Sequence, residues 1–336
     1  MRKVIFLVLG LWLTLNLSVY AQPITQPTGL TNIKVVGPFN KDNLTLFVLS
    51  GPDRMKNKNI LTLNEALKQN KVTVYETSNV NQLEIENHSD DIVFVQSGQI
   101  LKGGKQDRTL QSDIMLPPKS SRVPINVFCV EHGRWTKRLG ESSSAFHSAS
   151  ALVPAPALRY AARCANDQSM VWQQVENAQR KLSSNLGACL KSSVSPSSLQ
   201  LSLENEKVKA SVQNRLKDLN GIVDKTPNAI GYVCAVNGKI TSADIYATSA
   251  LFKKLWPDLL QACAVESLSE QAEGKLAYPN QSDVNKFLAR PLSGEVTERR
   301  LSAQVKEFKQ ESGNVVMFKT QDRSEATCVH VNYLVK

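Results

Sequence analysis

Two short stretches of the sequence carry side chains that could do chemistry, and the first is SGQILKGGKQDR at residues 97–108. A glycine pair in this stretch allows positive φ and the close approach of a ligand or a strand. The lysine and arginine that follow bind anions through charge-assisted hydrogen bonds. The pattern therefore fits either a bulged hairpin turn with solvated charges or a ligand-binding site made by Gly103, Gly104, Lys105, Gln106, Asp107 and Arg108.

This stretch does not fit the known nucleotide-binding loops. Gly98 and Gly103 have the glycine spacing of a phosphate-binding loop, but Gly104 stands where the lysine belongs. Lys105 is followed by Gln106, so no hydroxyl is placed for magnesium, and no GxGxxG fingerprint is present. The residues that follow are strand-like, so no helix N-terminus is expected there to hold a phosphate. We predict no cofactor and reject the phosphate-loop interpretation.

The second stretch is FCVEHGRW at residues 128–135. Alternate side chains of a strand share a face, so Cys129 and Glu131 point the same way. Apolar residues on both faces indicate a central strand, and a carboxylate at its end needs a partner. Arg134 and the cations of the first stretch are the candidates. Glu131 then either forms a buried ion pair that locks two hairpins together or acts as general base in a pocket.

Nucleophilic and metal chemistry have weak support in the sequence. Cys129 lies near His132 along the chain, but the two side chains are expected on opposite faces, whereas a Cys–His pair needs hydrogen-bond contact. His147 or His330 could supply a base only through the fold. The four histidines are scattered without a metal-binding spacing, so we predict no metal site.

The elements that must position these stretches begin with a strand-rich section at residues 32–140. LTLNEALKQN, which starts at residue 61, predicts a short helix because Thr62 and Glu65 have capping-box spacing. Apolar runs bounded by turn residues predict the strands of this section. They cover residues 43–50, 71–75, 82–86, 91–96, 108–116 and 121–131.

A crossover and two helices occupy residues 141–227. The part up to Asp167 is rich in Ser, Ala and Pro and is predicted to be irregular. Apolar residues then recur at helical spacing in two segments, which predicts a central pair of amphipathic helices. These apolar residues are Val171, Val175, Ala178 and Leu182 in one helix, and Val208, Val212, Leu216, Leu219 and Val223 in the other.

The last section, residues 228–336, returns to strands. Asn237-Gly238 between two apolar strands is a strong signal for a type I′ hairpin. A helix is expected from about Ser249, with Pro257 either kinking it or starting a second helix, and Ser282 is expected to cap another. An antiparallel meander over 297–309, 314–319 and 327–335 closes the chain. Because no βαβ alternation occurs, we predict one composite α+β domain over residues 32–336 with mainly antiparallel sheets.

The N-terminus predicts an exported protein. Arg2 and Lys3 precede an apolar run, and small residues precede a cleavage point after Ala21, which is typical of a secretory signal peptide at residues 1–21. The run is short of the roughly 20 residues that span a bilayer. We therefore expect a periplasmic or secreted chain with a flexible start at residues 22–31 and no membrane partner after cleavage.

Charge and cysteines narrow the partners and the covalent links. Loss of Arg2 and Lys3 changes the formal charge from +10 to +8, and the cations are spread along the chain, so no nucleic-acid partner is expected. Export permits disulfides, and the six cysteines have wide, irregular spacings. We expect one or at most two disulfides without assigning partners. The oligomeric state is not predicted.

Both stretches together resemble the ARG-and-rhodanese-phosphatase-superfamily-associated protein domain family, a domain of unknown function. The resemblance continues through VWQQVENAQRKL and AIGYVCAVNGKITSADIYATSALFKKLWPDLL, and it covers about residues 32–335. Asp107 stands where the family often has Asn, and His132 where Gln is usual. The matching positions are Gly103, Gly104, Lys105, Gln106, Arg108, Cys129, Glu131, Gly133, Arg134 and Trp135.

The resemblance implies a link to ADP-ribose or NAD-derived metabolites, because the family is associated in genomes with ADP-ribosylglycohydrolases. This is association and carries no mechanism. The first hypothesis is an exported binding module for an anionic or nucleotide-derived small molecule, held by Lys105, Gln106 and Arg108 with Glu131 and Arg134 in support. The second is a hydrolase of an ADP-ribose-like or phosphorylated molecule, with Glu131 or Asp107 as general base. The third is a structural scaffold without a ligand.

Overall fold

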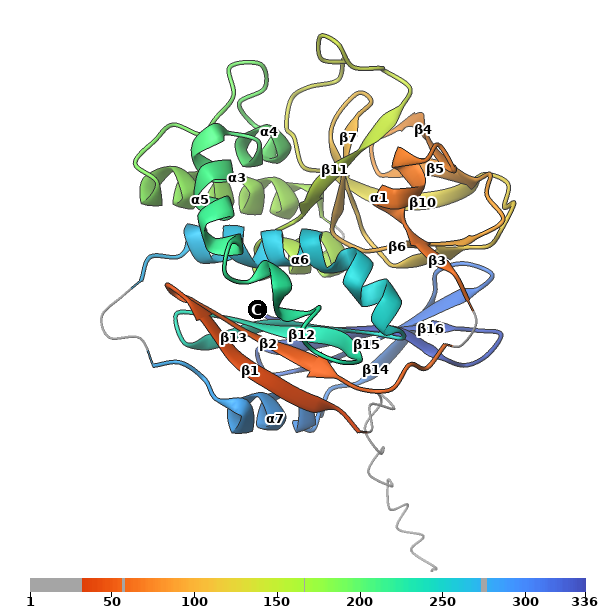
Figure 1. Ribbon diagram of the computed structural model, residues 1–336. Coiled ribbons are helices and arrows are strands. Elements are labelled where there is room, and N and C mark those ends of the chain that lie inside the picture. The colour runs from red at the N-terminus through yellow and green to blue at the C-terminus, as the bar shows by residue number, and fades with distance from the viewer. Residues whose placement is uncertain (1–31, 56–57, 166, 273–276) are drawn as a thin grey trace, which may run out of the picture.

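The computed structural model describes residues 32–55, 58–165, 167–272 and 277–336. The predicted signal peptide and the residues up to 31 lie outside this part of the chain. A broad sheet forms the base of the molecule, and α6 lies across it (Figure 1). The smaller sheets and the remaining long helices lie on the other side of α6. The α+β class with mainly antiparallel sheets is confirmed.

The large sheet joins the two ends of the domain. β1 pairs with β2, and β2 pairs with β12 from the last third of the chain. Its order is β1-β2-β12-β13-β17-β16-β15-β14, and every pair in it is antiparallel. All eight residues of β12 are buried, as expected for an apolar strand covered on both faces. The strands are β1 (Lys34–Lys41), β2 (Leu44–Ser50), β12 (Ala229–Val236), β13 (Lys239–Tyr246), β14 (Val296–Arg300), β15 (Val305–Ser312), β16 (Val315–Asp322) and β17 (Cys328–Val335).

The Asn-Gly hairpin is confirmed. Asn237 and Gly238 connect β12 to β13 with φ of 51° and 75°, the positive values that a type I′ turn requires. A Cβ on Gly238 would also collide with the carbonyl oxygen of Ala277. Glycine is therefore required there by both the backbone conformation and the close neighbour.

Two smaller sheets carry the first of the two stretches and the strand that leads into the second. A six-stranded sheet has the order β11-β7-β8-β10-β5-β4, and a three-stranded sheet has the order β3-β6-β9. β3 and β6 pair in parallel, which the sequence did not predict. The strands are β3 (Ile60–Thr62), β4 (Val72–Asn79), β5 (Gln82–Asn87), β6 (Ile92–Val95), β7 (Gln99–Gly103), β8 (Arg108–Leu110), β9 (Ile114–Leu116), β10 (Val123–Cys129) and β11 (Phe146–Leu152).

Helix α6 (Ser249–Ser269) is the central helix of the fold. It contacts β12 of the large sheet, and it also contacts α3 (Gln168–Asn185), α5 (Glu206–Leu216), β3 and β11. From Ala262 to its end every residue is buried, as expected for a helix covered on all sides. Pro257 lies inside it, so one helix continues through the proline. The other helices are α1 (Leu63–Lys68), α2 (Pro156–Tyr160), a π-helical turn (Ala161–Ala165), α4 (Leu199–Leu203), a 3-10 turn (Asn220–Ile222) and α7 (Gln281–Ala289).

Several local predictions can be compared directly with the structure. The capping box of Thr62 and Glu65 is present at α1. The four apolar residues predicted for α3 are all buried, and Val208, Val212 and Leu216 are buried in α5. α5 ends at Leu216, so Leu219 and Val223 lie beyond it although both are buried. The cap of α7 is Asn280 rather than Ser282, because the Asn280 side chain accepts from the N–H groups of Ser282 and Asp283.

Three predicted segments are divided differently in the structure. The strand expected at residues 108–116 is two strands in different sheets, because the chain bends at residues 111–113 and buries Asp113. The stretch expected to be irregular up to residue 167 contains β11 and α2. The strand expected at residues 297–309 is split into β14 and β15. Tertiary partners decided the two strand divisions, since the local sequence there is compatible with continuous strands.

Candidate functional site

The GGKQD turn between β7 and β8 depends on both glycines. Gly103 and Gly104 have φ of 123° and 55°. A Cβ on Gly103 would lie 2.8 Å from the carbonyl oxygen of Ala145, and a Cβ on Gly104 would collide with the ring of Phe146. The pair therefore lets β11 approach the turn closely.

Asp107 is the centre of the turn's polar contacts and is fully buried. Its carboxylate accepts two hydrogen bonds from Arg138, at 2.5 Å and 2.9 Å, in a bidentate pair. It also accepts from the Ser198 hydroxyl at 2.9 Å and from the Gly103 N–H at 3.1 Å. Every side of this carboxylate is occupied by protein donors.

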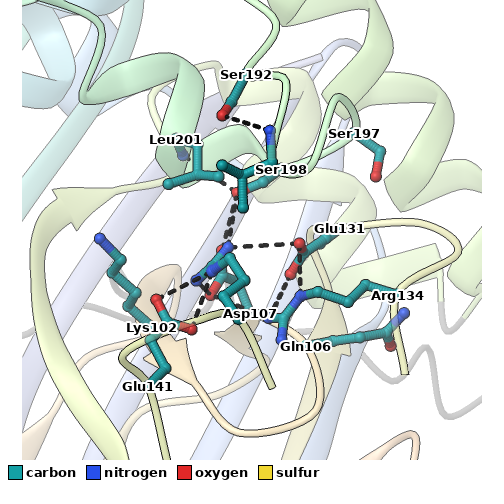
Figure 2. Close-up of polar contacts among 12 residues, drawn as sticks. Lys102, Gln106, Asp107, Glu131, Arg134, Glu141, Ser192, Ser197, Ser198 and Leu201 are labelled. Atoms are coloured by element: carbon teal, nitrogen blue, oxygen red, sulfur yellow. Dashed lines mark hydrogen bonds and ion pairs between the residues drawn. The ribbon is translucent and has the colours of Figure 1, made fainter. Parts of the chain in front are cut away.

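Glu131 lies beside Asp107 and is also fully buried. Arg134 donates to its two oxygens at 2.7 Å and 2.6 Å, and the Asp107 N–H donates to Oε2 at 3.0 Å. Arg138 reaches Oε1 at 3.4 Å, so this arginine bridges the two acids. Asp107, Glu131, Arg134 and Arg138, with Ser198, form what we call the buried ion-pair network; Figure 2 shows the labelled members directed toward one another.

Burial and pairing act in opposite directions on the two acids. Burial would raise the pKa of Glu131, but hydrogen bonds from Arg134 and Ser195 outweigh it and lower the pKa. Burial raises the pKa of Asp107 even though the Arg138 guanidinium opposes it. Because both oxygens of Glu131 already accept from Arg134, this carboxylate has no free position for a substrate proton. The geometry favours the ion-pair interpretation of Glu131 over the general-base one.

The cations of the first stretch lie on the outer side of the turn and do not contact Glu131. Lys105 donates to the Ser78 hydroxyl at 2.8 Å and sits 5.2 Å from the centre of the Trp135 ring. Arg108 is fully buried 5.5 Å from the same ring, with Glu76 at 3.8 Å. Of the three candidate partners of Glu131, Arg134 is confirmed, whereas Lys105 and Arg108 do not contact it. Arg138 is a second partner that the sequence did not indicate.

Two nitrogen atoms of the Arg108 guanidinium lack hydrogen-bond partners in the described part of the chain. Its Nε and Nη2 atoms are buried without a hydrogen-bond partner within the described residues. Its Nη1 atom donates to the Gln106 side chain at 3.4 Å, a long hydrogen bond. A buried guanidinium with free donors is costly unless water or a ligand accepts from it.

A cavity of about 430 Å³ adjoins the second stretch, and we call it the His132 cavity. The backbone N–H and carbonyl of His132 both bond to the Ser197 hydroxyl, at 3.1 Å and 2.6 Å, which fixes the loop against the chain before α4. The His132 ring packs against Trp172 of α3 with ring centres 4.3 Å apart. The lining residues are His132, Trp172, Gln173, Val175, Glu176, Gln179, Lys191, Pro196 and Ser197.

Polar groups in the His132 cavity could bind a ligand. The Trp172 indole N–H is buried and has no acceptor among the described residues. Lys191 is exposed, and the described residues give it no ion pair. An indole donor, an imidazole and an ammonium group around one cavity suit the oxygens of an anionic or polar molecule.

Cysteine chemistry is not favoured at this site. Cys129 is fully buried, and burial raises the pKa of its thiol to about 11. Its Sγ contacts the Val80 carbonyl, whereas the His132 ring faces Trp172, so the two do not form a Cys–His pair. All six cysteines are free thiols, so the structure contains none of the disulfides that we expected. No group of three potential metal ligands occurs among the described residues.

A second buried polar cluster joins the three sheets around His330. Its Nδ1 lies 2.8 Å from Asp113 and its Nε2 lies 3.0 Å from Asp244. Arg163 pairs with Asp113 at 3.1 Å, and Arg159 pairs with Asp244 at 3.2 Å. These five side chains come from the loop before β9, from β13, from β17 and from the α2 segment. Their ion pairs connect these elements in the interior of the molecule.

The pKa values of this cluster follow from its pairing. Burial would lower the pKa of His330, but the carboxylates of Asp113 and Asp244 outweigh it and raise the pKa. Burial would raise the pKa of Asp244, but Arg159 and His330 lower it to about 2. The two carboxylates therefore favour the protonated form of His330, which is a stabilising arrangement rather than a free base.

Sequence reasoning missed Arg138, Ser198 and Trp172. Arg138 lies four residues after Arg134 in the same loop. The basic residues after Gly133 could therefore have indicated a second partner for the buried acids. Ser198 and Trp172 reach the site from α4 and α3, more than 30 residues away in sequence, and no local pattern marks them. His330 was considered only as a remote base, and its role in the second cluster depends on strand pairing.

Comparison with known proteins gives a family for the chain. No helix of the described residues is long and apolar enough to cross a membrane. No curated protein and no solved structure was found to match the chain. The model of the family described as ARG and Rhodanese-Phosphatase-superfamily-associated Protein domain matches residues 32–334. The match covers both stretches, all three sheets and the His132 cavity, and the chain therefore belongs to the ARG and Rhodanese-Phosphatase-superfamily-associated Protein domain family.

Proposed function

We propose that this protein is an exported binding module for a small anionic or polar ligand, and that the ligand occupies the His132 cavity. The observation that carries the proposal is a cavity of about 430 Å³ that Lys191, His132 and Trp172 line, beside a buried Trp172 N–H that has no acceptor among the described residues. A volume of this size lies within the range of small-molecule sites. Export rests on the N-terminal sequence alone.

The buried ion-pair network supports this function by fixing the loop that lines the cavity. Glu131 precedes His132 directly, and its bidentate pair with Arg134 prevents the loop from opening. Ser198 connects Asp107 to the chain that carries Ser197, which in turn binds the His132 backbone. Charged groups that satisfy one another can thus hold a ligand site rigid without contacting the ligand.

The ligand class follows from the groups that face the cavity. Lys191 and the indole N–H offer donors, and Glu176 at the edge supplies an acceptor for a hydroxyl. A phosphorylated or carboxylated molecule with hydroxyl groups fits this set. An ADP-ribose-like or other nucleotide-derived compound belongs to that class, and the family's name makes it the first compound to test.

A hydrolase remains the alternative, and its support is the opposite displacement of the pKa values of Asp107 and Glu131. Against it, both acids are saturated by protein donors and fully buried. If the protein does hydrolyse ADP-ribose derivatives with Glu131 as base, Glu131→Gln should abolish turnover. Turnover that persists in this variant excludes Glu131 from the mechanism.

Binding is tested with a thermal-shift screen of ADP-ribose, nucleotides, sugar phosphates and polyanions, followed by calorimetry on the best compound. Lys191→Ala should weaken binding by about tenfold, the effect of losing one charged contact. Lys209→Ala is the matched control, since Lys209 is an exposed lysine that pairs with Glu206 on α5, away from the cavity. Lys105→Ala tests the outer side of the GGKQD turn instead.

The outcomes separate the three interpretations. Loss of affinity in Lys191→Ala alone supports the His132 cavity, and loss in Lys105→Ala alone moves the ligand to the Lys105 and Arg108 side. If no compound raises the melting temperature, the binding proposal fails. The scaffold interpretation is then the one that agrees with the buried network.

A further inference from the structure

A second cavity, of about 460 Å³, lies between α3, the β12–β13 hairpin and the C-terminal end of α6. It shares none of its lining residues with the His132 cavity. Its walls combine apolar groups with polar side chains of several kinds. The residues that matter here are Arg180, Lys181, Lys239, Thr241, Glu266 and Glu270, and we call this space the Glu266 cavity.

Glu266 is a buried acid without a cationic partner. It is 5% exposed, and no lysine, arginine or histidine nitrogen of the described residues lies within 4.0 Å of its carboxyl group. Asp107, Asp113 and Asp244, by contrast, each pair with a buried arginine. The Cys234 thiol, 4.0 Å from Oε2, is a weak donor. A buried carboxyl group in this situation gains strongly from a cation that enters the cavity.

The surroundings of Glu266 set its titration. Burial raises the pKa of Glu266 to about 7, so the acid is partly protonated at neutral pH. Thr241 and Arg159 oppose this increase, and the charge of Glu270 adds to it. The titratable or charged groups that face it from the packed elements are Cys234 of β12, with Cys263 of α6 beside it, Arg159 of α2, and Glu270.

The rim of the cavity has the opposite charge. Arg180 is exposed and donates only a long hydrogen bond, 3.4 Å, to Asn177. Lys239 is exposed at the start of β13 and makes no ion pair with the described residues. Lys181 is already neutralised by Glu270 at 2.5 Å. Two cations thus remain available at the rim above one unpaired acid at the wall.

We propose that the Glu266 cavity binds a small zwitterion of the amino-acid class, with its ammonium group on Glu266 and its acidic group on Arg180 or Lys239. The ammonium group supplies the counter-ion that the fold does not give to Glu266. The acidic group pairs with exposed cations whose long side chains can move toward it. A simple amine meets the positive rim, and a simple carboxylic acid leaves Glu266 unpaired, so each half alone binds more weakly.

The test is calorimetry of the full chain with the free amino acids, with matched carboxylic acids that lack the amine, and with matched alkylamines. An amino acid should bind at least tenfold more tightly than either matched fragment. Its affinity should increase about tenfold from pH 6 to pH 8, because the ionised fraction of an acid with a pKa of about 7 rises from about one eleventh to about ten elevenths. The amine itself stays charged over this range.

Variants decide whether Glu266 is the contact. Glu266→Gln should weaken amino-acid binding at least tenfold and remove the pH dependence. Glu270→Gln is the control, since it removes a more exposed acid of the same cavity and should change affinity less than threefold. The thermal melting curve of each variant verifies that it is folded. The proposal is overturned if no amino acid binds, if the matched carboxylic acid binds equally well, or if Glu266→Gln binds as tightly as the wild type.

Discussion

Replacing Arg138 by methionine should strongly destabilise the protein. The Arg138 side chain is 4% exposed and bridges two fully buried acids. Methionine keeps much of the side chain's volume and removes only the guanidinium group. The change leaves Glu131 with Arg134 as its partner. Asp107 loses both of its short charged hydrogen bonds and keeps Ser198, the Gly103 N–H and a longer ion pair with Arg134 at 3.7 Å.

The magnitude follows from these contacts. Two charged hydrogen bonds to a buried carboxylate are worth about 1.5–3 kcal/mol each. Removing one partner of a buried ion pair costs about 3–5 kcal/mol, which agrees with that sum. The two bonds from Arg138 to Glu141 add little, because Glu141 is more exposed than the buried acids. We therefore expect Arg138→Met to lower the free energy of unfolding by about 3–5 kcal/mol.

The assay is urea denaturation at pH 7, with Glu141→Gln as the matched control. The control removes a partner of the same arginine and should lower the unfolding free energy by less than about 1 kcal/mol. Adding Asp107→Asn to Arg138→Met should recover part of the loss, because it removes a buried charge whose remaining ion pair, with Arg134, is long. The deficit of Arg138→Met should also shrink as the pH falls, because burial raises the pKa of Asp107 and protonation removes its buried charge. A loss no larger than that of the control would refute the description of this cluster as a buried lock.

Three further predictions concern the rest of the fold. His330 has a raised pKa in the folded state, so stability should decline as pH rises above about 6.5, the usual value for histidine, and His330→Gln should remove that decline in denaturation curves. Gly104→Ala should cost about 1–3 kcal/mol through overlap with Phe146, whereas Gly140→Ala, which meets no neighbour within 4 Å, should cost less in the same measurement. Maleimide should label Cys189 first in the native protein, because it is the one exposed cysteine; mass spectrometry showing equal labelling of the buried thiols would contradict this.

The sequence located the site but did not determine its internal partners. Both stretches meet in the structure, and Glu131 and Asp107 lie in contact through the Asp107 N–H. The predicted pairing of Lys105 and Arg108 with Glu131 was wrong, because the turn directs its acid inward and leaves the cations on the side of Trp135. Backbone φ at the glycine pair decides this direction, and one-dimensional spacing does not specify it.

What the sequence determined by itself is local. The helix start at Thr62, the apolar face of α3 and the turn at Asn237-Gly238 depend on a few neighbouring residues, and each agrees with the structure. The pairing of β2 with β12, the division of residues 108–116 and the partners of Asp107, Asp113 and Glu266 depend on residues far apart in sequence. These distant contacts contribute strongly to the free energy of folding, because a buried charge without a partner is costly and its partner can come from any part of the chain. Only the tertiary structure could show which buried acids pair with an arginine and that Glu266 instead faces a cavity.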